Sequence, residues 1–527
     1  MTELIHQLVE QQTNYAPNAP ALFHKKQAFT YSELSSHISA AAIGFISLGL
    51  KPSERIAIYL PKIPEIIFSI FGAAKAGGVF VPINPLLKPN QVKYILQDCN
   101  VRILVTSSDR LKLLNDILTD CHDLKTVILV DNKKDSVEKA LHAIEIINWN
   151  HLIENSSDCK SHYRIDSDMA AILYTSGSTG SPKGVVLSHR NMVAGAKSVV
   201  EYLENKPEDK LLAALPFSFD YGLSQLTTAF SVGASVVLMD YLLPRDVIRA
   251  VARHQITGLA AVPPLWNQLA QLEWPSEAIE SLRYMTNSGG AMPKATLASL
   301  RTALPNSQFY LMYGLTEAFR STYLPPDEID NRPDSMGKAI PNAEVMVVRE
   351  DGSFCSPGEP GELVHRGALV AMGYWNDPAK TAERFKPTPR QNNALTIPEI
   401  AVWSGDTIKM DADGFLYFVG RKDDMIKTSG YRVSPTEVEE AIYSSKLVSE
   451  VVALGIPHPT LGQGILVITT TNGHLDGDAI INHCKKELPN FMVPHAIEKA
   501  DSLPRNPNGK IDRKLLSSQY QDIFNPS

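Results

Sequence analysis

Short apolar runs alternate with longer amphipathic segments along the first quarter of the chain. The strand-like runs cover residues 55–60, 78–82, 101–106 and 126–130, and the helical segments between them include 64–76 and 91–98. Period-two or continuous apolar runs predict strands, and a helical period predicts amphipathic helices. Regular alternation of the two predicts a mostly parallel sheet with helices on both faces. Residues 131–168 are polar and irregular, so a surface excursion is predicted there.

The alternation continues through the middle of the chain, where each strand-like run ends in a turn rich in glycine or hydroxyl residues. Strands are predicted at 234–239, 257–261, 283–286 and 308–311, and helices at 191–202, 246–254 and 265–272. At the N-terminus we expect a helix at 5–15, strands at 19–23 and 27–30, and a helix capped by Thr30 and Glu33. Ligands of open α/β sheets bind beyond the carboxyl ends of strands, so these turns are expected to converge on one site.

From Lys338 onward short strands with frequent turns predict a small β-rich subdomain. A charged stretch then begins at Gly420 and leads into a last segment with helices at 436–443 and 478–487 and strands at 450–454 and 465–470. The predicted fold class is α/β, with a large N-terminal domain of packed α/β sheets plus a small β subdomain at 1–419, and a small α+β domain at 420–527. More than one domain is expected in 527 residues because single cores stop growing near about 300.

Composition describes an ordinary soluble globular protein, with 44% apolar and 20% charged residues. The 57 acidic and 50 basic side chains give a net charge of -7, which lacks the positive excess typical of nucleic-acid-binding proteins. The five cysteines are scattered without paired spacing, so we expect no disulfide framework or zinc site and a reducing, cytoplasmic location. The N-terminus lacks the pattern of a signal peptide, and Lys75 and several glycines interrupt the most apolar stretch, 66–83, so no membrane span is expected.

Residues 174–184 carry the clearest chemistry and read Tyr-Thr-Ser-Gly-Ser-Thr-Gly-Ser-Pro-Lys-Gly, directly after the apolar run 170–173. Glycines let backbone N–H groups approach an anion, hydroxyls add donors without bulk, and Lys183 supplies a charge suited to phosphate. The loop is not a Walker A motif, because Lys183 does not follow directly on a glycine with Ser or Thr after it. The alternative is a mobile Gly/Ser-rich surface loop.

Four further motifs follow in order, and each alone could be a turn or a solvated charge cluster. They are Tyr313-Gly-Leu-Thr-Glu, Ser404-Gly-Asp, Gly420-Arg-Lys-Asp with Lys427-Thr-Ser-Gly-Tyr-Arg, and Pro504-Arg-Asn-Pro-Asn-Gly-Lys. Together with the glycine loop, over essentially the whole chain, they closely resemble the adenylate-forming superfamily of acyl-CoA synthetases, adenylation domains and luciferases. Tyr313-Gly-Leu-Thr-Glu-Ala-Phe-Arg-Ser-Thr-Tyr with Ser429-Gly-Tyr-Arg-Val-Ser-Pro also resembles the ligases associated with exosortase A systems.

This resemblance implies a two-step reaction with ATP and Mg²⁺. A carboxylate attacks the α-phosphate of ATP to give an acyl-adenylate and pyrophosphate, and a thiol then displaces AMP. The thiol is CoA or the phosphopantetheine of a carrier protein, which the sequence does not distinguish. A luciferase-like oxygenase has no supporting residue beyond the shared scaffold. A catalytically silent nucleotide-binding protein would be expected to lack Lys183, Glu317 or Lys510, and all three are present.

The resemblance also implies a role for each matched residue. The ATP-binding loop would comprise Thr175, Ser176, Gly177, Ser178, Thr179, Gly180 and Lys183. Ser288, Gly289, Gly290, Ala291 and Tyr313 would frame the adenine, while Asp406 and Arg421 would hold the ribose. Thr316 would contact the α-phosphate, Glu317 would bind Mg²⁺, and Lys510 would bridge the carboxylate and the α-phosphate. Asp423 matches the hinge of a mobile C-terminal domain, and Gly430 lies where the family passes the thiol.

The acyl side departs from the pattern of ordinary acyl-CoA synthetases, which often carry a histidine after the Leu-Pro dipeptide. Here Phe219 and Asp220 occupy that point, which is similar to amino-acid adenylation domains whose aspartate pairs with the substrate ammonium. A buried carboxylate needs a cation or donors, and an amino-bearing acid would supply one. Asp220 could instead bond locally, and Arg320 could meet a second substrate carboxylate or pair with Asp220. The expected pocket comprises Asp220, Tyr221, Ser224, Ala261, Ser288, Met312, Arg320 and Ser321.

Overall fold

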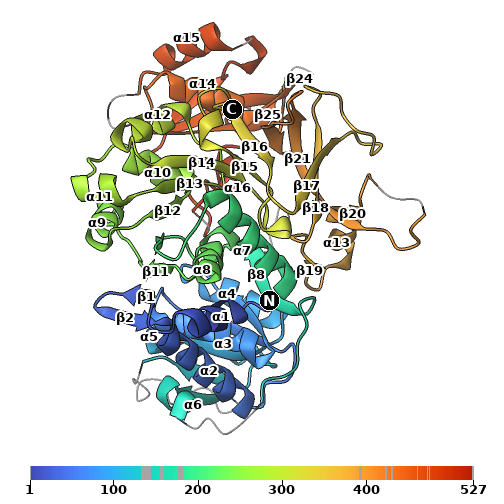
Figure 1. The fold of residues 1–527 in the computed structure, drawn as a ribbon. Helices are drawn as coiled ribbons and strands as arrows, with labels where there is room; N and C mark the ends of the chain where they lie inside the picture. Colours follow the sequence, from blue (N-terminus) through green and yellow to red (C-terminus); the bar gives the residue numbers. More distant parts are fainter. Residues whose placement is uncertain are drawn as a thin grey trace.

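The computed structural model describes residues 2–524 except 132–143, 155–159, 176–181, 391–393, 422–423, 429–430, 460, 472, 474, 489 and 508. Two large sheets and one smaller sheet organise this part of the chain (Figure 1). The fold class predicted from the hydrophobic pattern, α/β with packed sheets and a small α+β C-terminal part, is confirmed.

The first large sheet has eight strands in the order β19-β9-β8-β4-β3-β5-β6-β7. The strands are β3 (Arg55–Tyr59), β4 (Val79–Pro82), β5 (Val101–Thr106), β6 (Thr126–Leu129), β7 (Glu145–Asn148), β8 (Met169–Thr175), β9 (Lys183–Ser188) and β19 (Gly373–Tyr374). The six strands from β8 to β7 pair in parallel, whereas β9 and β19 are antiparallel to their neighbours. Thr175 and Lys183 are register partners, so they close the two ends of the glycine loop against one another.

The second large sheet has fourteen strands and changes character along its length. A parallel half contains β1 (Pro20–His24), β11 (Ser235–Leu238), β10 (Lys210–Ala213), β12 (Gly258–Ala261), β13 (Tyr284–Asn287) and β14 (Gln308–Tyr313). Antiparallel strands continue it, namely β15 (Thr322–Leu324), β16 (Ser335–Ala339), β22 (Leu416–Arg421), β21 (Ile400–Met410), β18 (Gly361–Gly367) and β17 (Ala343–Val348), with β2 (Gln27–Thr30) and β20 (Phe385–Pro387) at edges. The predicted small β subdomain is therefore an extension of the parallel sheet.

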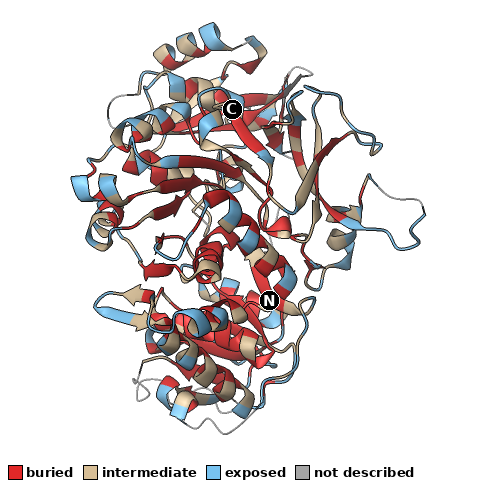
Figure 2. Ribbon diagram, viewed as in Figure 1, coloured by how far each residue is buried: buried red, intermediate tan, exposed pale blue. Residues whose placement is uncertain are grey.

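Helices fill the space between the two large sheets and cover their outer faces (Figures 1 and 2). The inner helices are α1 (Gln7–Tyr15), α2 (Tyr31–Ser47), α3 (Pro64–Ala76), α7 (His189–Leu203) and α8 (Asp220–Val232). The outer ones are α4 (Pro89–Asp98), α5 (Ser108–Leu118), α9 (Pro244–His254), α10 (Pro263–Leu269), α11 (Ser276–Ser281) and α12 (Lys294–Ala303), with the short α13 (Pro378–Arg384) beside β19. The capping box expected at Thr30 and Glu33 is confirmed at the start of α2.

The surface excursion predicted at 131–168 is wrong for much of its described length. Strand β7 forms the outer edge of the first sheet, and α6 (Trp149–Glu154) follows it directly. Ile147, Trp149 and Leu152 are buried, and an added Cβ at Gly44 on α2 would lie 2.6 Å from Leu152. These apolar residues are separated by polar ones and belong to elements of four and six residues, which are too short for a period to be recognised.

The C-terminal part has its own five-stranded sheet and its own buried clusters. It comprises β23 (Ile426–Thr428), β24 (Tyr431–Val433), β25 (Glu450–His458), β26 (Gly462–Thr470) and β27 (Ala496–Lys499), with α14 (Pro435–Ser444), α15 (Gly477–Glu487) and α16 (Arg513–Gln519). Gly420 and Arg421 belong to β22 and thus to the second large sheet. Among the described helices, none combines the length and apolar character needed to cross a bilayer.

Candidate active site

The turns after the parallel strands of the second sheet meet the start of α8. The hydroxyl of Thr316, after β14, donates to Oδ1 of Asp220 at 3.0 Å. Nη1 of Arg320 reaches back to the Ser288 hydroxyl, after β13, at 3.3 Å. The convergence predicted from strand ends is therefore present, because parallel strands end at the same edge of a sheet.

Asp406 occupies a polar corner formed by the antiparallel strands. Its carboxylate accepts a 2.5 Å hydrogen bond from the Tyr313 hydroxyl and lies 3.4 Å from Nε of Arg421, its register partner on the next strand. Its own N–H donates to the Ser404 hydroxyl. Burial raises the pKa of Asp406, and Arg421 and Tyr313 act in the opposite direction. Tyr313, predicted to frame the adenine, is thus adjacent to Asp406 and Arg421, which are predicted to hold the ribose.

Glu317 lies at a second polar corner, where the first sheet meets the turn after β14. Its Oε1 accepts a 2.5 Å hydrogen bond from the Tyr374 hydroxyl, and the ammonium of Lys183 lies 5.3 Å from the centre of the same ring. Burial lowers the pKa of Lys183, and Lys380 and Arg384 lower it further. Three cations therefore gather beside the ends of the glycine loop, an arrangement that suits a polyphosphate.

Tyr374 and Arg384 were missed by sequence reasoning. Tyr374 belongs to a two-residue strand, and Arg384 ends a short helix among other charged residues, so neither stands out in a pattern. In the fold, Arg384 donates to the Trp403 carbonyl at 3.2 Å, and its guanidinium lies over Gly405, where a Cβ would collide with Nη1. The glycine of Ser404-Gly-Asp is therefore required by a close approach of Arg384. The only available signal was the aromatic pair Tyr374-Trp375 in a polar stretch.

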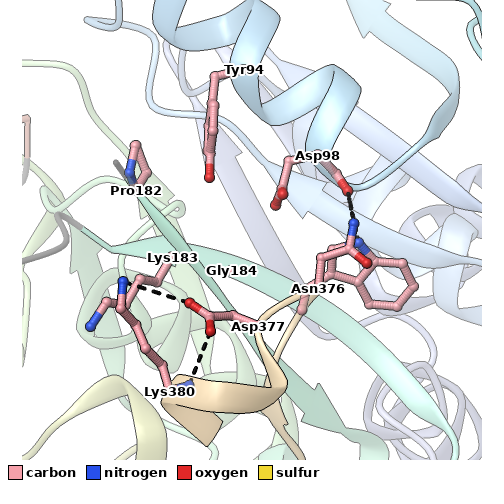
Figure 3. A pocket seen from close by; sticks show the side chains of 9 residues that line it. Tyr94, Asp98, Pro182, Lys183, Gly184, Asn376, Asp377 and Lys380 are labelled. Atoms are coloured by element: carbon pink, nitrogen blue, oxygen red, sulfur yellow. Dashed lines mark hydrogen bonds and ion pairs between the residues drawn. The ribbon is translucent and has the colours of Figure 1, made fainter. Parts of the chain in front are cut away.

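A small pocket opens beside Lys183 (Figure 3). It is lined by Tyr94, Asp98, Pro182, Lys183, Gly184, Trp375, Asn376, Asp377 and Lys380. Asp98, at the end of α4, accepts from the Tyr174 hydroxyl at 2.5 Å, and its carbonyl accepts from Trp375 and Asn376. These bonds tie both β8, which leads into the glycine loop, and the segment after β19 to the end of α4.

Lys510 reaches the site from the C-terminal part. Its ammonium lies 5.7 Å from the centre of the Phe219 ring, and its Cε is 3.3 Å from where a Cβ would stand on Gly289. Burial lowers the pKa of Lys510 and Arg421 acts in the same direction, while Asp220, Asp406 and Glu317 raise it. The lysine thus faces carboxylates from both the nucleotide side and the acyl side.

The turn that carries Lys510 is held in place by the rest of the chain. Its N–H donates to the Asn506 side chain at 3.1 Å, and Gly509 adopts a φ of +80°, which favours glycine. The Asn84 side chain donates to the Pro507 carbonyl, which joins the turn to the loop after β4.

On the acyl side, Asp220 and Arg320 are almost completely buried, with 4% and 1% of their surface exposed. Burial raises the pKa of Asp220, and Arg320, Thr316 and Lys510 act against it. The guanidinium of Arg320 lies 4.8 Å from the centre of the Tyr221 ring. No described carboxylate oxygen lies within 4.0 Å of its nitrogens, so Asp220 and Arg320 do not form an ion pair.

The other residues predicted to line the pocket are largely inaccessible to solvent. Tyr221, Ser224, Ala261, Met312 and Ser321 are all buried. The sulfur of Met312 accepts a 3.1 Å hydrogen bond from the Tyr202 hydroxyl, and the Ser321 hydroxyl lies 3.0 Å from Nδ1 of His365. His365 was not predicted from the sequence, since an isolated histidine in a strand has no distinguishing pattern. It is fully buried, which lowers its pKa to about 4.

One strained residue joins the two halves of the site. Thr316–Ala318 form a single 3₁₀ turn that ends at Phe319, whose φ is +56°. A non-glycine residue in this region costs roughly 1–3 kcal/mol and persists only where packing enforces it. The Phe319 ring is fully buried against Gly195 on α7, where a Cβ would lie 2.6 Å from the ring. This turn places Glu317 toward the nucleotide side and Arg320 toward the acyl side.

Several predicted residues lie outside the described part of the chain, namely Ser176, Gly177, Ser178, Thr179, Gly180, Asp423 and Gly430. Gly290 and Ala291 lie beyond β13, where Ala291 is exposed, while Ser288 is buried. The described residues hold no cluster of three or more metal-ligating side chains. Glu317 alone still fits Mg²⁺ that arrives with ATP, because this ion takes one or two carboxylates together with phosphate oxygens and water.

Comparison with known families gives two matches in the order expected from the motifs. The profile of the AMP-binding enzymes matches residues 9–375, and that of the AMP-binding enzyme C-terminal domain matches residues 437–510. Asp406 and Arg421 lie between the two matched ranges.

Similar sequences come from two kinds of protein. A long-chain-fatty-acid–CoA ligase of Escherichia coli O157:H7 is 30% identical over 97% of this chain and 94% of its own length. A linear gramicidin synthase of Brevibacillus parabrevis is 31% identical over 97% of this chain, which spans 10% of that much longer protein.

Similar structures cover the whole chain. The anthranilate CoA ligase AuaEII, solved in complex with anthranoyl-AMP, superimposes with a TM-score of 0.87 at 25% identity and covers 98% of each chain. ATP-bound MatB from Rhodopseudomonas palustris gives a TM-score of 0.86 at 24% identity over 99% of this chain and all of its own. The chain belongs to the family of AMP-binding enzymes, the adenylate-forming superfamily that its motifs resemble.

Proposed function

We propose that this protein is an AMP-forming acid–thiol ligase that activates a carboxylic acid with ATP and transfers the acyl group to CoA. The observation that carries the proposal is the position of Lys510. A cation from the C-terminal part enters between the acyl-side carboxylate Asp220 and the nucleotide-side carboxylates Asp406 and Glu317. Two anionic reactants, a carboxylate and a phosphate, meet at such a position only if their repulsion is offset.

In the first step an oxygen of the substrate carboxylate attacks the α-phosphorus of ATP, and the bond from this phosphorus to the bridging oxygen breaks. Pyrophosphate leaves with the electron pair. Positioning and charge neutralisation are the main tasks of the protein in such a transfer. Thr316, whose hydroxyl donates to Asp220 in this structure, would turn this hydroxyl to the α-phosphate. Lys510 neutralises the carboxylate and the α-phosphate, and Lys183, Lys380 and Arg384 neutralise the departing pyrophosphate.

Magnesium would be held by Glu317, whose carboxylate the Tyr374 hydroxyl orients through its 2.5 Å hydrogen bond. When bound, the ion screens the charge of the phosphates. Glu317 itself stands in a single 3₁₀ turn beside the strained Phe319, which fixes the direction of its carboxylate.

In the second step the thiol sulfur attacks the acyl carbonyl, the bond to the AMP oxygen breaks, and AMP leaves while the thiol proton passes to solvent. Lys510 has no task in this step, so we propose that the C-terminal part swings away about Asp423 and brings Gly430 to the thiol path. A division of the chain between the end of β22 at Arg421 and the start of β23 at Ile426 suits this motion, because residues 426–524 contain a separate sheet and separate cores.

The alternative that a specific observation favours is an amino-acid ligase that loads a carrier protein. Asp220 is buried at the position where amino-acid adenylation domains hold the substrate ammonium, and its one described side-chain donor is Thr316. A substrate ammonium would complete its environment. We propose a cytoplasmic location for either enzyme, consistent with four described cysteines that are all free.

Pyrophosphate release across a panel of fatty, aryl, dicarboxylic and amino acids tests the proposal. Release with at least one acid, followed by thioester formation with CoA, is expected. Exchange with amino acids together with transfer to a carrier protein and not to CoA would favour the alternative. No release with any acid from protein that binds ATP would refute both.

A further inference from the structure

Arg320 is a buried cation whose positive charge is not matched by an adjacent anion among the described residues. Its side chain is 1% exposed, and its Nε has no hydrogen-bond partner. Its Nη1 donates, at 3.3 Å, to the neutral hydroxyl of Ser288. A buried charge without a partner costs roughly several kcal/mol of stability. A buried arginine of this kind is therefore expected where a bound anion supplies the partner.

Two tyrosines lie beside the guanidinium. The Tyr221 ring lies 4.8 Å away, and the charge of Arg320 opposes the rise in the pKa of Tyr202, which burial brings to about 12. The Tyr221 hydroxyl is engaged with Thr286, whereas the Tyr202 hydroxyl donates to Met312 and is also a neutral hydrogen-bond partner of Arg320. The phenols therefore hold the guanidinium in place by stacking and packing without neutralising it.

Asp220 does not fulfil this role either. Its described side-chain donor is Thr316, and it stays beyond ion-pair distance of Arg320, although the charge of Arg320 opposes the rise in the pKa of Asp220 more than any other group does. Gly314 meanwhile lets Arg320 lie against the chain, since a Cβ there would come within 3.2 Å of the Arg320 Cα. The strained turn at Phe319 constrains the backbone that leads into Arg320.

We infer that Arg320 recognises a second carboxylate on the substrate, at the end away from the reacting one. The edge of the guanidinium that carries Nε is the edge from which arginine binds a carboxylate through two parallel hydrogen bonds. The substrate is therefore an acid with two carboxylates, one activated near Lys510 and one bound by Arg320. This inference rests on the proposed ligase activity and specifies its substrate class.

The experiment measures pyrophosphate release with pairs of acids of equal chain length. Each pair consists of a dicarboxylic acid and its monoamide, which keeps the shape and removes the charge. For at least one length, the wild-type enzyme is expected to prefer the diacid by about 100-fold or more in kcat/KM, the scale of leaving a buried charge unpaired. Equal use of both members at every length, or use of the monoamide alone, overturns the inference and leaves the ligase proposal intact.

The variant Arg320→Met separates recognition from structure. Its kcat/KM for the diacid is expected to fall by about 100-fold or more, while that for the monoamide stays within a few-fold of wild type or rises. Arg249→Met, at a surface arginine with 69% of its side chain exposed, serves as the matched control and should change neither value. If a folded variant loses kcat/KM equally for the diacid and the monoamide, Arg320 has a structural role and the inference is overturned. If Arg320→Met does not fold, the wild-type preference alone decides. Absence of release with every acid, including simple monoacids, refutes the ligase proposal instead.

Discussion

Asp406 and Asp220 are two carboxylates of one site, buried to nearly the same extent, but their surroundings differ. Asp406 has a phenol donor at 2.5 Å, from Tyr313 on β14, and a guanidinium at 3.4 Å, from Arg421 on the neighbouring strand β22. Asp220 has a single described hydroxyl donor, and the nearby cation Arg320 remains beyond ion-pair distance. The nucleotide side is therefore built from groups that neutralise one another, whereas the acyl side keeps opposite charges apart. That difference is expected if ATP is a fixed reactant and the acid supplies the missing partners.

Lys510→Ala should give the largest effect, because it removes the one group that serves both sides. Adenylation is expected to fall on the order of 10³-fold, the scale of losing a cation that stabilises a phosphate transition state. ATP binding should change little, since Tyr313, Asp406 and Lys183 stay in place. Pyrophosphate release and calorimetric ATP titration measure the two effects. Lys514→Ala, at an exposed lysine of α16, is the control, and unchanged release in Lys510→Ala would contradict the assigned role.

The variants Asp406→Asn and Asp220→Asn test the comparison directly. Asp406→Asn should raise the KM for ATP about tenfold, because hydrogen bonds to a charged acceptor are worth about 1.4 kcal/mol more than those to a neutral one. The KM for the acid should stay unchanged at saturating ATP. Asp220→Asn should instead raise the KM for the acid and leave the KM for ATP unchanged. If both variants changed the same KM, the two sides would not be separate.

The protein should also become less stable at mildly acidic pH because of His365, which lies beside Ser321 on the acyl side. Burial lowers the pKa of His365 to about 4 from 6.5. Below pH 6.5 this histidine therefore binds a proton in the unfolded chain but stays neutral in the folded chain. The free energy of unfolding should therefore fall by about 1.4 kcal/mol per pH unit from this residue as the pH drops from 6.5 to about 4. Urea unfolding of wild type and His365→Leu should show a shallower pH dependence in the variant. His122→Gln, at the surface, should match wild type, and identical slopes in all three would exclude this role.

Tyr374→Phe is expected to have the smallest effect. It keeps the ring beside Lys183 and removes only the hydroxyl that orients Glu317, so the Mg²⁺ concentration for half-maximal release should rise about threefold to tenfold. A magnesium titration of pyrophosphate release measures this shift. A change in the KM for the acid without a change in magnesium dependence would place Tyr374 outside the metal site.

Sequence reasoning recovered the parallel sheets and the turns at their ends, because strand runs such as 101–106 and helices such as 64–76 carry strong periods. It did not predict β7 and α6, because these elements have few apolar residues. Their burial depends on packing with distant segments, such as that of α6 against Gly44 of α2. Tyr313 and Asp406 form a hydrogen bond and the charge of Asp406 acts on Lys510, while the roles that the resemblance implies for these residues stay predictions. Tyr374, Arg384 and His365 were not predicted, since their proximity to the site depends on strand pairing between distant segments.

The left-handed turn at Phe319 also bears on how this pocket could be redesigned. Two residues separate Glu317 from Arg320, and the packing of the Phe319 ring on Gly195 fixes both the direction and the spacing of the pair. An insertion or deletion here would shift the metal-side carboxylate and the acyl-side cation together. Libraries that aim at new acids should therefore keep the loop length, Phe319 and Gly195 constant, and vary positions 320 and 321 by substitution alone.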